Sequence, residues 1–512
     1  MSASQGQNPC VVASRPKAAA VDPRHLTVDL GRARALPELL ALHQRHGDDF
    51  NGFHIGAFWS KFKALARGGF GGFSVRLAPV CKQTARMLPE LDARQVANVA
   101  HAFAKAELVG AGPWESVWAA LPEAVRRRLG DFNPQGLSNT AWAFATAGLA
   151  SQELFNAISA EVVRRRLDDF NPQELSNTAW AFATTSHASE ELFKAISAEV
   201  VSRRLGDFDP QALSNTAWAF ATTGHASREL FKAISAEVVR RRVGEFNPQH
   251  LSNTAWAFAS AGHASFELFH VISAELVLRG LGDFKPQHIA NTAWAFASAG
   301  HASSELFRVI SAEVVRRGLG DVSPQHLSNT AWAFAVVDPP SADALFGTAS
   351  FTTRCAHLEK SFSSAELSQL HQWSLWRKER RALWPGLPNS LHQACLDAFV
   401  AEGETSSQLQ SDVVREIRSY DVNVKEEHRC KVSGYSIDAL VTLNNGEQIA
   451  VEVDGPSHFL GRSHQPTGST LLKHRQLRYF GWRLESVPYW EWGAGGRQLG
   501  AALVAKLKNG RA

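Results

Sequence analysis

Amide side chains recur at one fixed spacing through much of this chain of 512 residues. The segment Asn-Pro-Gln-x-Leu-Ser-Asn-Thr-Ala-Trp-Ala-Phe-Ala returns with small changes every 38 residues. On a helical wheel, its Gln and second Asn lie opposite the apolar Leu and Phe. A helix that serves only packing needs no amide at this outward position in every copy. We therefore expect a row of hydrogen-bonding groups for a polymeric ligand, which comprises Gln135, Asn139, Asn177, Asn215, Asn253, Asn291 and Asn329.

The Asn row has a second interpretation, in which each Asn bonds the backbone of a neighbouring repeat.

The position three residues before the Asn varies between copies, as expected for a protein that reads one RNA base per repeat. Drift at an exposed position predicts the same variation. The candidate base-reading residues at this position include Glu174, His250, His288 and His326.

Arginines gather where the second helix of each copy is expected to end. At the repeat spacing they would form a ridge that follows a phosphate backbone. Alternatively, they offset the helix macrodipole and pair with nearby acids such as Asp168. The candidate phosphate-binding residues are Arg164, Arg165, Arg166, Arg240 and Arg241. The Trp of each copy either stacks on a base or is wedged between repeats.

Acidic side chains also gather near the C-terminus, on two segments with the alternation of β-strands. Glu452 and Asp454 lie two residues apart on one strand, so they share a face of the sheet. Carboxylates at a strand end are typical of Mg²⁺ sites that hydrolyse phosphodiesters. The candidate catalytic residues are Asp438, Glu452, Asp454, His458 and Lys473, with Asp438 and Asp454 as metal ligands. Alternatively, Asp438 and Glu452 pair with Lys473 or Arg475 and stabilise the fold.

The elements that must position these residues follow from the repeat. Each copy reads helix, turn, helix: an Asn-Pro start, an apolar stripe, a break at Gly or Thr, and a second helix that opens at Ser. The fold class is therefore mainly α, a right-handed solenoid of helical hairpins with about six near-identical repeats and degenerate caps, followed by a small α/β domain. We expect a disordered segment or transit peptide at residues 1–35, the solenoid at 36–375 with clear repeats at 131–345, linker helices at 376–406 and the α/β domain at 407–510.

Composition sets broad limits. The formal charge of +4 is only mildly basic, so a nucleic-acid surface must come from local clustering. Five scattered Cys residues without CxxC spacing argue against a zinc site or a disulfide framework. No apolar run is long enough to span a membrane. Residues 1–20 are rich in Ser and Ala and lack acids, which is typical of organelle transit peptides and also of disordered tails.

The repeat resembles the octotricopeptide repeat of algal organelle proteins and the repeats of the FAST-kinase-like family. The C-terminal string from Val451 to Phe459, followed by Leu472–Leu477 and Gly481-Trp482, is similar to a RAP domain. The resemblance implies a mitochondrial or chloroplast protein that binds single-stranded RNA, either a transcript or rRNA. It further implies a role in RNA processing, mRNA stability, splicing or translation, together with other ribonucleoprotein components. It also implies that the RAP domain is similar to PD-(D/E)XK nucleases.

Three hypotheses follow. The first is a non-catalytic RNA-binding protein that needs no cofactor for binding. The second is an endoribonuclease that uses Mg²⁺ in the RAP domain. The Glu-x-Lys pair of such nucleases reads Glu452-Val453-Asp454 here, so Lys473 would have to supply the missing lysine. The third hypothesis is a helical scaffold that binds proteins.

Overall fold

The structure is a computed structural model that describes residues 23–66, 74–241, 243–401, 407–420, 422–461 and 463–509. These residues form two compact units, Met1–Leu192 and Phe193–Ala512. The predicted transit peptide, residues 1–20, lies outside the described part of the chain.

The first unit consists of helices. Its helices are α1 (Pro23–Arg32), α2 (Leu36–His46), α3 (Gly52–Leu65), α4 (Ser74–Met87), α5 (Ala93–Lys105), α6 (Glu115–Arg127), α7 (Pro134–Ala147), α8 (Gln152–Arg164) and α9 (Pro172–Thr184). Short 3-10 turns lie at η1 (Gly47–Asp49), η2 (Leu88–Glu90), η3 (Leu129–Asp131) and η4 (Leu167–Asp169). Helix α10 (Glu190–Ser202) spans the boundary between the units.

Helix α1 corrects the predicted start of the folded chain. The segment up to residue 35 was expected to be disordered or a transit peptide, yet Pro23–Arg32 is helical. Leu26 and Leu30 lie one helical turn apart, and both are buried where α1 packs on α3. Two leucines in a short polar segment are a weak periodic signal, which is why the folded region was placed too late.

The second unit continues the helical repeats and ends in a mixed domain. Its repeat helices are α11 (Pro210–Thr222), α12 (Arg228–Arg240), α13 (Pro248–Ser260), α14 (Phe266–Arg279), α15 (Pro286–Ser298), α16 (Ser304–Arg317), α17 (Pro324–Val337), α18 (Ala342–Phe346), α19 (Ser350–His357), α20 (Ser364–Glu379) and α21 (Asn389–Ala401), with 3-10 turns η5 (Leu205–Asp207) and η6 (Glu359–Ser361). The mixed domain comprises α22 (Gln408–Arg418), β1 (Asn423–Arg429), β2 (Ser436–Thr442), β3 (Gln448–Asp454), η7 (Pro456–His458), α23 (Gly468–Tyr479), β4 (Arg483–Pro488) and α24 (Tyr489–Asn509).

Each repeat is a helical hairpin that begins at a capped N-terminus. We call its first helix the A helix (α7, α9, α11, α13, α15, α17) and its second the B helix (α8, α10, α12, α14, α16). In α7, Asn133 Oδ1 accepts the Gly136 N–H at 2.8 Å, and Pro134 occupies the first turn. Leu137 and Phe144 are buried on its inner side. The sequence predicted this N-cap and this apolar face.

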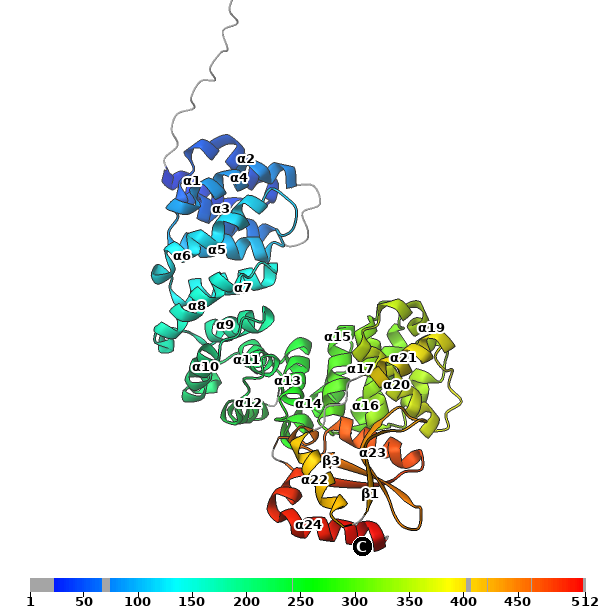
Figure 1. Ribbon diagram of the computed structural model, residues 1–512. Helices are drawn as coiled ribbons and strands as arrows, with labels where there is room; N and C mark the ends of the chain where they lie inside the picture. The colour runs from blue at the N-terminus through cyan, green and yellow to red at the C-terminus, as the bar shows by residue number, and fades with distance from the viewer. Residues whose placement is uncertain are drawn as a thin grey trace, which may run out of the picture. The chain divides into compact units, whose positions relative to one another are not determined.

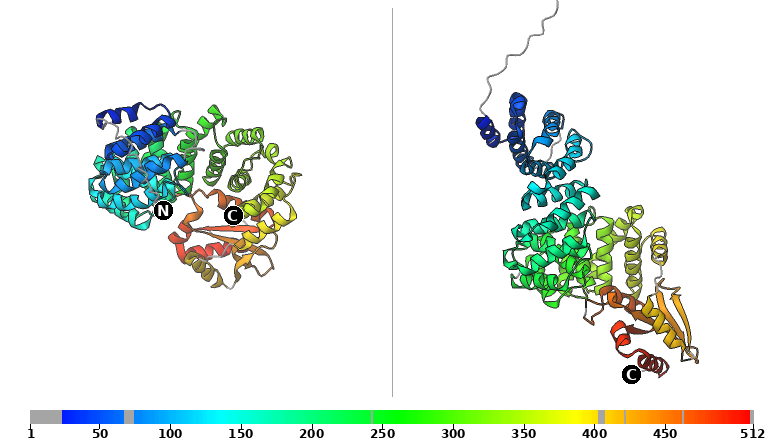
Figure 2. Two further views of the ribbon diagram at one scale, coloured as in Figure 1. Left: turned by 90° about the horizontal axis from the view of Figure 1, so that it is seen from above. Right: turned by 60° about the vertical axis from the view of Figure 1, so that its left-hand side comes forward.

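Within the second unit, the A helices α13, α15, α17 and the later helix α20 lie side by side, each packed on the next. They run from green to yellow-green in Figure 2. The B helices pack less closely on one another than the A helices do. Within this unit, the outward face of α13, α15 and α17 therefore forms a continuous surface.

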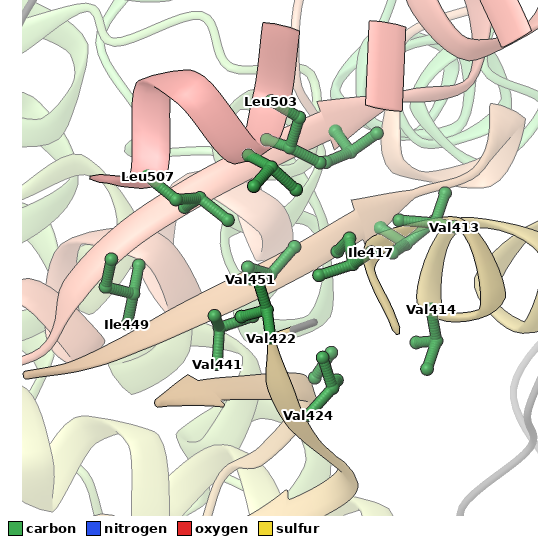
Figure 3. Close-up of a cluster of buried hydrophobic side chains, with 14 of the residues drawn as sticks. Val413, Val414, Ile417, Val422, Val424, Val441, Ile449, Val451, Leu503 and Leu507 are labelled. Atoms are coloured by element: carbon green, nitrogen blue, oxygen red, sulfur yellow. The ribbon is translucent and has the colours of Figure 1, made fainter. Parts of the chain in front are cut away.

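The C-terminal domain is built on a four-stranded sheet in the order β1-β2-β3-β4. The first three strands are antiparallel, and β4 pairs parallel to β3 after the crossover helix α23 (Figure 1). Val441, Ile449 and Val451 on one face of the sheet pack on α22 and α24, through side chains such as Ile417 and Leu507 (Figure 3). This core fixes the strands that carry the predicted carboxylates.

The opposite face of the sheet packs towards the end of the repeats. Ile437 and Leu477 share a buried cluster with Leu375 of α20 and Phe399 of α21. Arg475 of α23 donates to the backbone carbonyl oxygens of Ala335 and Val336 at the C-terminal end of α17. The mixed domain is thus joined to the last repeats through both apolar and polar contacts.

Candidate nucleic-acid interface

The six repeated asparagines occupy equivalent outward positions, and all six side chains are partly exposed. Within the described part of the chain, no residue forms a side-chain hydrogen bond with any of these amides. Neighbouring polar groups differ: Ser252 Oγ, for example, donates to the carbonyl oxygen of Gln249 at 3.2 Å. The structure therefore does not show the alternative bonding of each Asn to a neighbouring backbone. The six amides remain available to a ligand.

Gln and Trp extend this surface along each A helix. In α13, Gln249, Asn253 and Trp256 are spaced by four and three residues, which places them on one helical face. Gln249 is exposed, and Trp256 is partly exposed. Gln135, the corresponding residue of α7, is also exposed. We call the Gln, Asn and Trp of each A helix the polar stripe.

The Trp rings of the second unit contact one another from repeat to repeat. The ring centroids are 6.4 Å apart for Trp218 and Trp256, 6.4 Å for Trp256 and Trp294, and 6.2 Å for Trp294 and Trp332. Their interplanar angles are 34°, 32° and 31°. We call these four residues the Trp row. This packing agrees with rings wedged between repeats, and all but the buried Trp332 also keep part of their surface exposed.

The variable position of the repeat takes part in capping its own helix. Glu174 is buried and accepts the Asn171 N–H at 2.8 Å, which completes a capping box in α9. His250 and His288 likewise turn back to the N–H of their own N-cap residues. The side chain of the third helical residue thus accepts the backbone N–H of its own N-cap residue and stabilises the N-terminus of the helix. RNA contacts by Glu174, His250 and His288 stay a prediction beside this capping role; His326 has the same helical position and is partly buried.

Two of the predicted phosphate-binding arginines lie inside the junction between repeats. Only 17% of the Arg165 side chain and 11% of the Arg241 side chain are exposed. Arg241 donates to Glu237 at 2.6 Å and to the carbonyl oxygen of Leu205, one repeat earlier, at 2.9 Å. Arg165 makes the corresponding bonds to Glu161 and Leu129. Because these bonds lie within the protein, Arg165 and Arg241 hold repeats together, and their predicted phosphate contacts stay a prediction.

The other predicted arginines face solvent. Arg164 and Arg240 are each 66% exposed, although each also forms an ion pair with a Glu three residues earlier. The bonds from Arg240 lower the pKa of Glu237 to about 2. Arg166 is 90% exposed and lies 4.0 Å from Asp168. These three guanidinium groups remain candidates for phosphate contacts, with part of their charge balanced by neighbouring carboxylates.

The predicted carboxylates lie on adjacent strands of the sheet, and one of them forms a buried ion pair. Glu452 is fully buried on β3, and its Oε2 lies 2.5 Å from Lys473 Nζ on α23. Burial raises the pKa of Glu452, and Lys473 counteracts this shift. Burial alone would lower the pKa of Lys473, but Glu452 and Asp438 hold it above its ordinary value. This arrangement matches the alternative in which Glu452 and Lys473 stabilise the fold.

Asp454 is surrounded by polar side chains from three elements. His458 Nδ1 lies 2.7 Å from its Oδ1, and His474 Nε2 lies 3.5 Å from its Oδ2. Ser486 of β4 also donates to Oδ2. Burial acts to raise the pKa of Asp454, but these bonds lower it far below the ordinary value. Asp454 is therefore an ionised acceptor with both oxygens bonded.

These donors do not fit the Mg²⁺ ion that the nuclease resemblance implies. Mg²⁺ requires a near-octahedral set of oxygen ligands that are free to coordinate it. Here both oxygens of Asp454 accept bonds from protein groups, and Glu452 is paired with Lys473. Asp438 Oδ2 accepts the Val453 N–H at 2.7 Å. In the part of the chain that is described, no three His, Cys, Asp or Glu side chains converge to hold a metal ion.

Sequence reasoning missed His474 and Ser486 as partners of Asp454. A signal for Ser486 exists only in the strand register, because it lies opposite Glu452 in the parallel pair of β3 and β4. His474 follows Lys473 on α23, so its proximity to the cluster was deducible once that helix was placed over the sheet. Both assignments depend on the crossover packing, which the sequence pattern does not specify.

Comparisons with known proteins match both parts of the chain. The family model described as RNA-editing substrate-binding complex 6 protein matches residues 76–381. The RAP domain model matches residues 451–495. A chloroplastic RAP domain-containing protein of Oryza sativa subsp. japonica is 34% identical over 87 residues. That match covers 17% of this chain and 13% of the rice protein.

Among solved structures, the crystal structure of an engineered protein aligns with 75% of this chain and 94% of its own, at 15% identity and a TM-score of 0.30. None of the helices described here combines the length and apolar character needed to cross a membrane.

Proposed function

Because this chain belongs to the family of RNA-editing substrate-binding complex 6 proteins and ends in a RAP domain, we propose that it binds single-stranded RNA along the polar stripe. The RNA is an organelle transcript or rRNA. The protein acts on its processing, stability, splicing or translation. The observation that carries this proposal is the set of six partly exposed amides, one per repeat, that have no hydrogen-bond partner among the described residues.

The periodicity of the surface supports a nucleic acid over an irregular ligand. A single strand presents a base and a phosphate at regular intervals, and each A helix presents the same Gln, Asn and Trp. The amides supply both donors and acceptors for base edges. The exposed parts of the Trp row provide ring surface for bases, at about 1–3 kcal/mol per stacked base. Arg164, Arg166 and Arg240 add charge for the phosphates.

The decisive experiment measures RNA affinity by fluorescence anisotropy, with a 5′-labelled pool of single-stranded RNA of randomised sequence. We expect affinity to fall as salt rises, because phosphate contacts release counterions. Replacing both Asn253 and Asn291 by Ala should weaken binding by about tenfold, at about 0.5–1.5 kcal/mol per lost hydrogen bond. The matched control is Ser252→Ala, since Ser252 is buried on the same helix.

Thermal melting should show that the double Asn variant remains folded, because these amides make no bond within the described structure. Binding that is indifferent both to salt and to the two Asn substitutions would reject the proposal. Localisation is tested separately with a fluorescent fusion of the full chain. We expect mitochondrial or chloroplast signal, and loss of that signal when residues 1–22 are removed.

One observation supports a second candidate function, which is binding to protein partners of a ribonucleoprotein complex. Helix α14 exposes Phe266 and Leu278, at 73% and 85%. The corresponding residues of α12 are Arg228 and Arg240. A pull-down that survives nuclease treatment, and is lost when Phe266 and Leu278 are both replaced by Arg, would support it. A pull-down unaffected by these replacements would exclude this surface.

A further inference from the structure

Two cavities meet where the last repeats contact the RAP domain. The first has a volume of about 740 Å³ and is lined by Trp294 and Trp332, the last two members of the Trp row. The second has a volume of about 380 Å³ and is lined by Asp438 and His458. Both are lined by the same four residues, Gln372, Phe399, Ser457 and Ser469. These shared residues make the two cavities immediate neighbours between the Trp row and the RAP carboxylates, and we call the pair the junction cleft.

Close backbone contacts hold the walls of this junction cleft together. A Cβ atom on Gly468 would lie 2.0 Å from the carbonyl oxygen of Ala297, so only glycine permits this approach of α23 to α15. Gly461 has a φ of +55°, and a Cβ there would lie 2.7 Å from the carbonyl oxygen of Gly262. Side chains larger than hydrogen are excluded at both contacts. The junction cleft is therefore defined by the packing of the RAP domain on the A helices.

We call the cavity lined by Asp438 and His458 the inner cavity. Its chemistry favours a nucleoside over a phosphate. Asp438 Oδ2 accepts the Val453 N–H, and no described residue donates to its other oxygen. The Lys and the Arg that line this cavity are already bonded: Lys473 is paired with Glu452, and Arg429 donates to the carbonyl oxygen of Gly434 at 3.1 Å. A free carboxylate oxygen accepts bonds from ribose hydroxyl groups and repels a phosphate. The ring of Phe399 supplies an apolar wall.

We propose that the junction cleft receives the 3′ end of the RNA strand that lies on the polar stripe, and that its inner cavity holds a terminal nucleoside with free 2′ and 3′ hydroxyl groups. This inference rests on the proposed function, because the strand must reach the cleft along the Trp row. The inner cavity lies within the usual range of small-ligand sites, about 300–1,000 Å³. Asp438 accepts from the ribose, and Ser457 and Ser469 line the entrance.

The test compares two 5′-labelled RNA pools of randomised sequence that differ only at the 3′ end, one with a hydroxyl group and one with a phosphate. For the unmodified protein we expect the hydroxyl form to bind about tenfold more tightly, because the added charge meets Asp438 at short range. Asp438→Asn removes the repelling charge but keeps an oxygen for the Val453 N–H. Ser469→Trp fills the entrance from an exposed position. Both variants should bring the two affinities close together.

Val432→Trp is the matched control, since Val432 is 63% exposed and lines neither cavity. It should retain the preference for the 3′ hydroxyl form. Equal affinities for the two RNA forms, or tighter binding of the phosphate form, would overturn the inference about the 3′ end. If RNA binding still depends on salt and on the two Asn residues, the proposed function stands in that case. Failure of both RNA forms to bind removes the proposed function and the inference with it. A melting curve confirms that each variant is folded.

Discussion

Arg241 donates a hydrogen bond of 2.8 Å to the carbonyl oxygen of Gly206, which lies one repeat earlier in the chain. The same bond occurs between Arg317 and Gly282 at 2.8 Å, and between Arg279 and Gly244 at 2.9 Å. The arginine at the end of each of these B helices thus donates to a carbonyl group in the turn before the A helix, one repeat earlier in the chain. The arginine ridge therefore contains two kinds of residue, one that joins repeats and one that faces solvent.

Replacing Arg241 by Ala should destabilise the protein by about 2–4 kcal/mol, because the carbonyl groups of Leu205 and Gly206 and the nearly buried Glu237 lose a charged partner. We expect RNA affinity measured well below the melting temperature to stay unchanged, since Arg241 is nearly buried. Denaturant unfolding followed by circular dichroism measures the stability. RNA anisotropy measures the affinity on the same preparation.

The neighbouring variant Arg240→Ala provides the control for Arg241. Arg240 is exposed and its bonds are made to Glu237 alone, so its loss should lower the unfolding midpoint less than the loss of Arg241 does. If Arg240 contacts a phosphate, the slope of log affinity against log salt should fall by about 0.7. Weaker RNA binding by Arg241→Ala with normal stability would contradict the structural role of Arg241.

Acid should weaken the repeats through the same ion pairs. The bonds from Arg240 lower the pKa of Glu237 to about 2 from an ordinary value of 4.5. A carboxyl group with a lowered pKa in the folded state stabilises the fold fully above pH 4.5, and this contribution is lost as pH falls towards 2. Glu313 is held in the same way. We expect melting temperature to fall over this interval, and to fall less steeply in a variant with Glu237→Gln and Glu313→Gln. An unchanged pH profile in this variant would contradict the assignment.

The repeat fold can be predicted closely from local sequence signals. Whether a given polar residue binds a ligand or stabilises the fold cannot be predicted in this way. Asn171 and Glu174 predict a capping box, and the structure contains it. The same Glu174 was also predicted to contact RNA, because variation between copies cannot distinguish a base-reading residue from one that caps its own helix. A side chain at the third helical position has both options, and only the packing of the first turn decides between them.

A similar limit applies to the arginines and the RAP carboxylates. Arg164 and Arg165 are adjacent in sequence, yet a rotation of about 100° sends one to solvent and the other into the junction. The pairing of Glu452 with Lys473 was foreseen as an alternative to catalysis, because both residues are charged and α23 must cross the sheet. The junction cleft was not foreseen, since it depends on contacts between elements as distant in sequence as Gly262 and Gly461.

Removal of divalent metal should leave RNA binding unchanged. The polar stripe uses amide and aromatic groups, and the donors around Asp454 do not fit Mg²⁺. We expect equal affinity with EDTA and with Mg²⁺, and intact RNA on a denaturing gel after incubation with Mg²⁺ or Mn²⁺. Cleavage that requires metal and is abolished by Asp454→Ala would instead establish the endonuclease hypothesis.

Arg475 should control how firmly the RAP domain is held against the repeats. Its Nε donates to Glu379 at 2.7 Å, and its Nη1 donates to the carbonyl oxygen of Val336 at 2.9 Å. Burial raises the pKa of Glu379, and Arg475 counteracts this shift. Replacing Arg475 by Ala leaves these acceptors without their donor, which costs about 2–4 kcal/mol at the junction. Hydrogen exchange should become faster in α23 and at the end of α17.

The neighbouring residue Arg478 on α23 is exposed, so Arg478→Ala is the matched control and should leave exchange unchanged. Because the junction cleft depends on this packing, Arg475→Ala should also reduce the preference for RNA with a 3′ hydroxyl group. Salt-dependent binding to the polar stripe should persist, since Asn215, Asn253 and Asn291 line neither cavity of the junction cleft and make no bond to Arg475. An unaltered 3′-end preference together with faster exchange would show that the RAP domain holds the RNA end without support from the repeats.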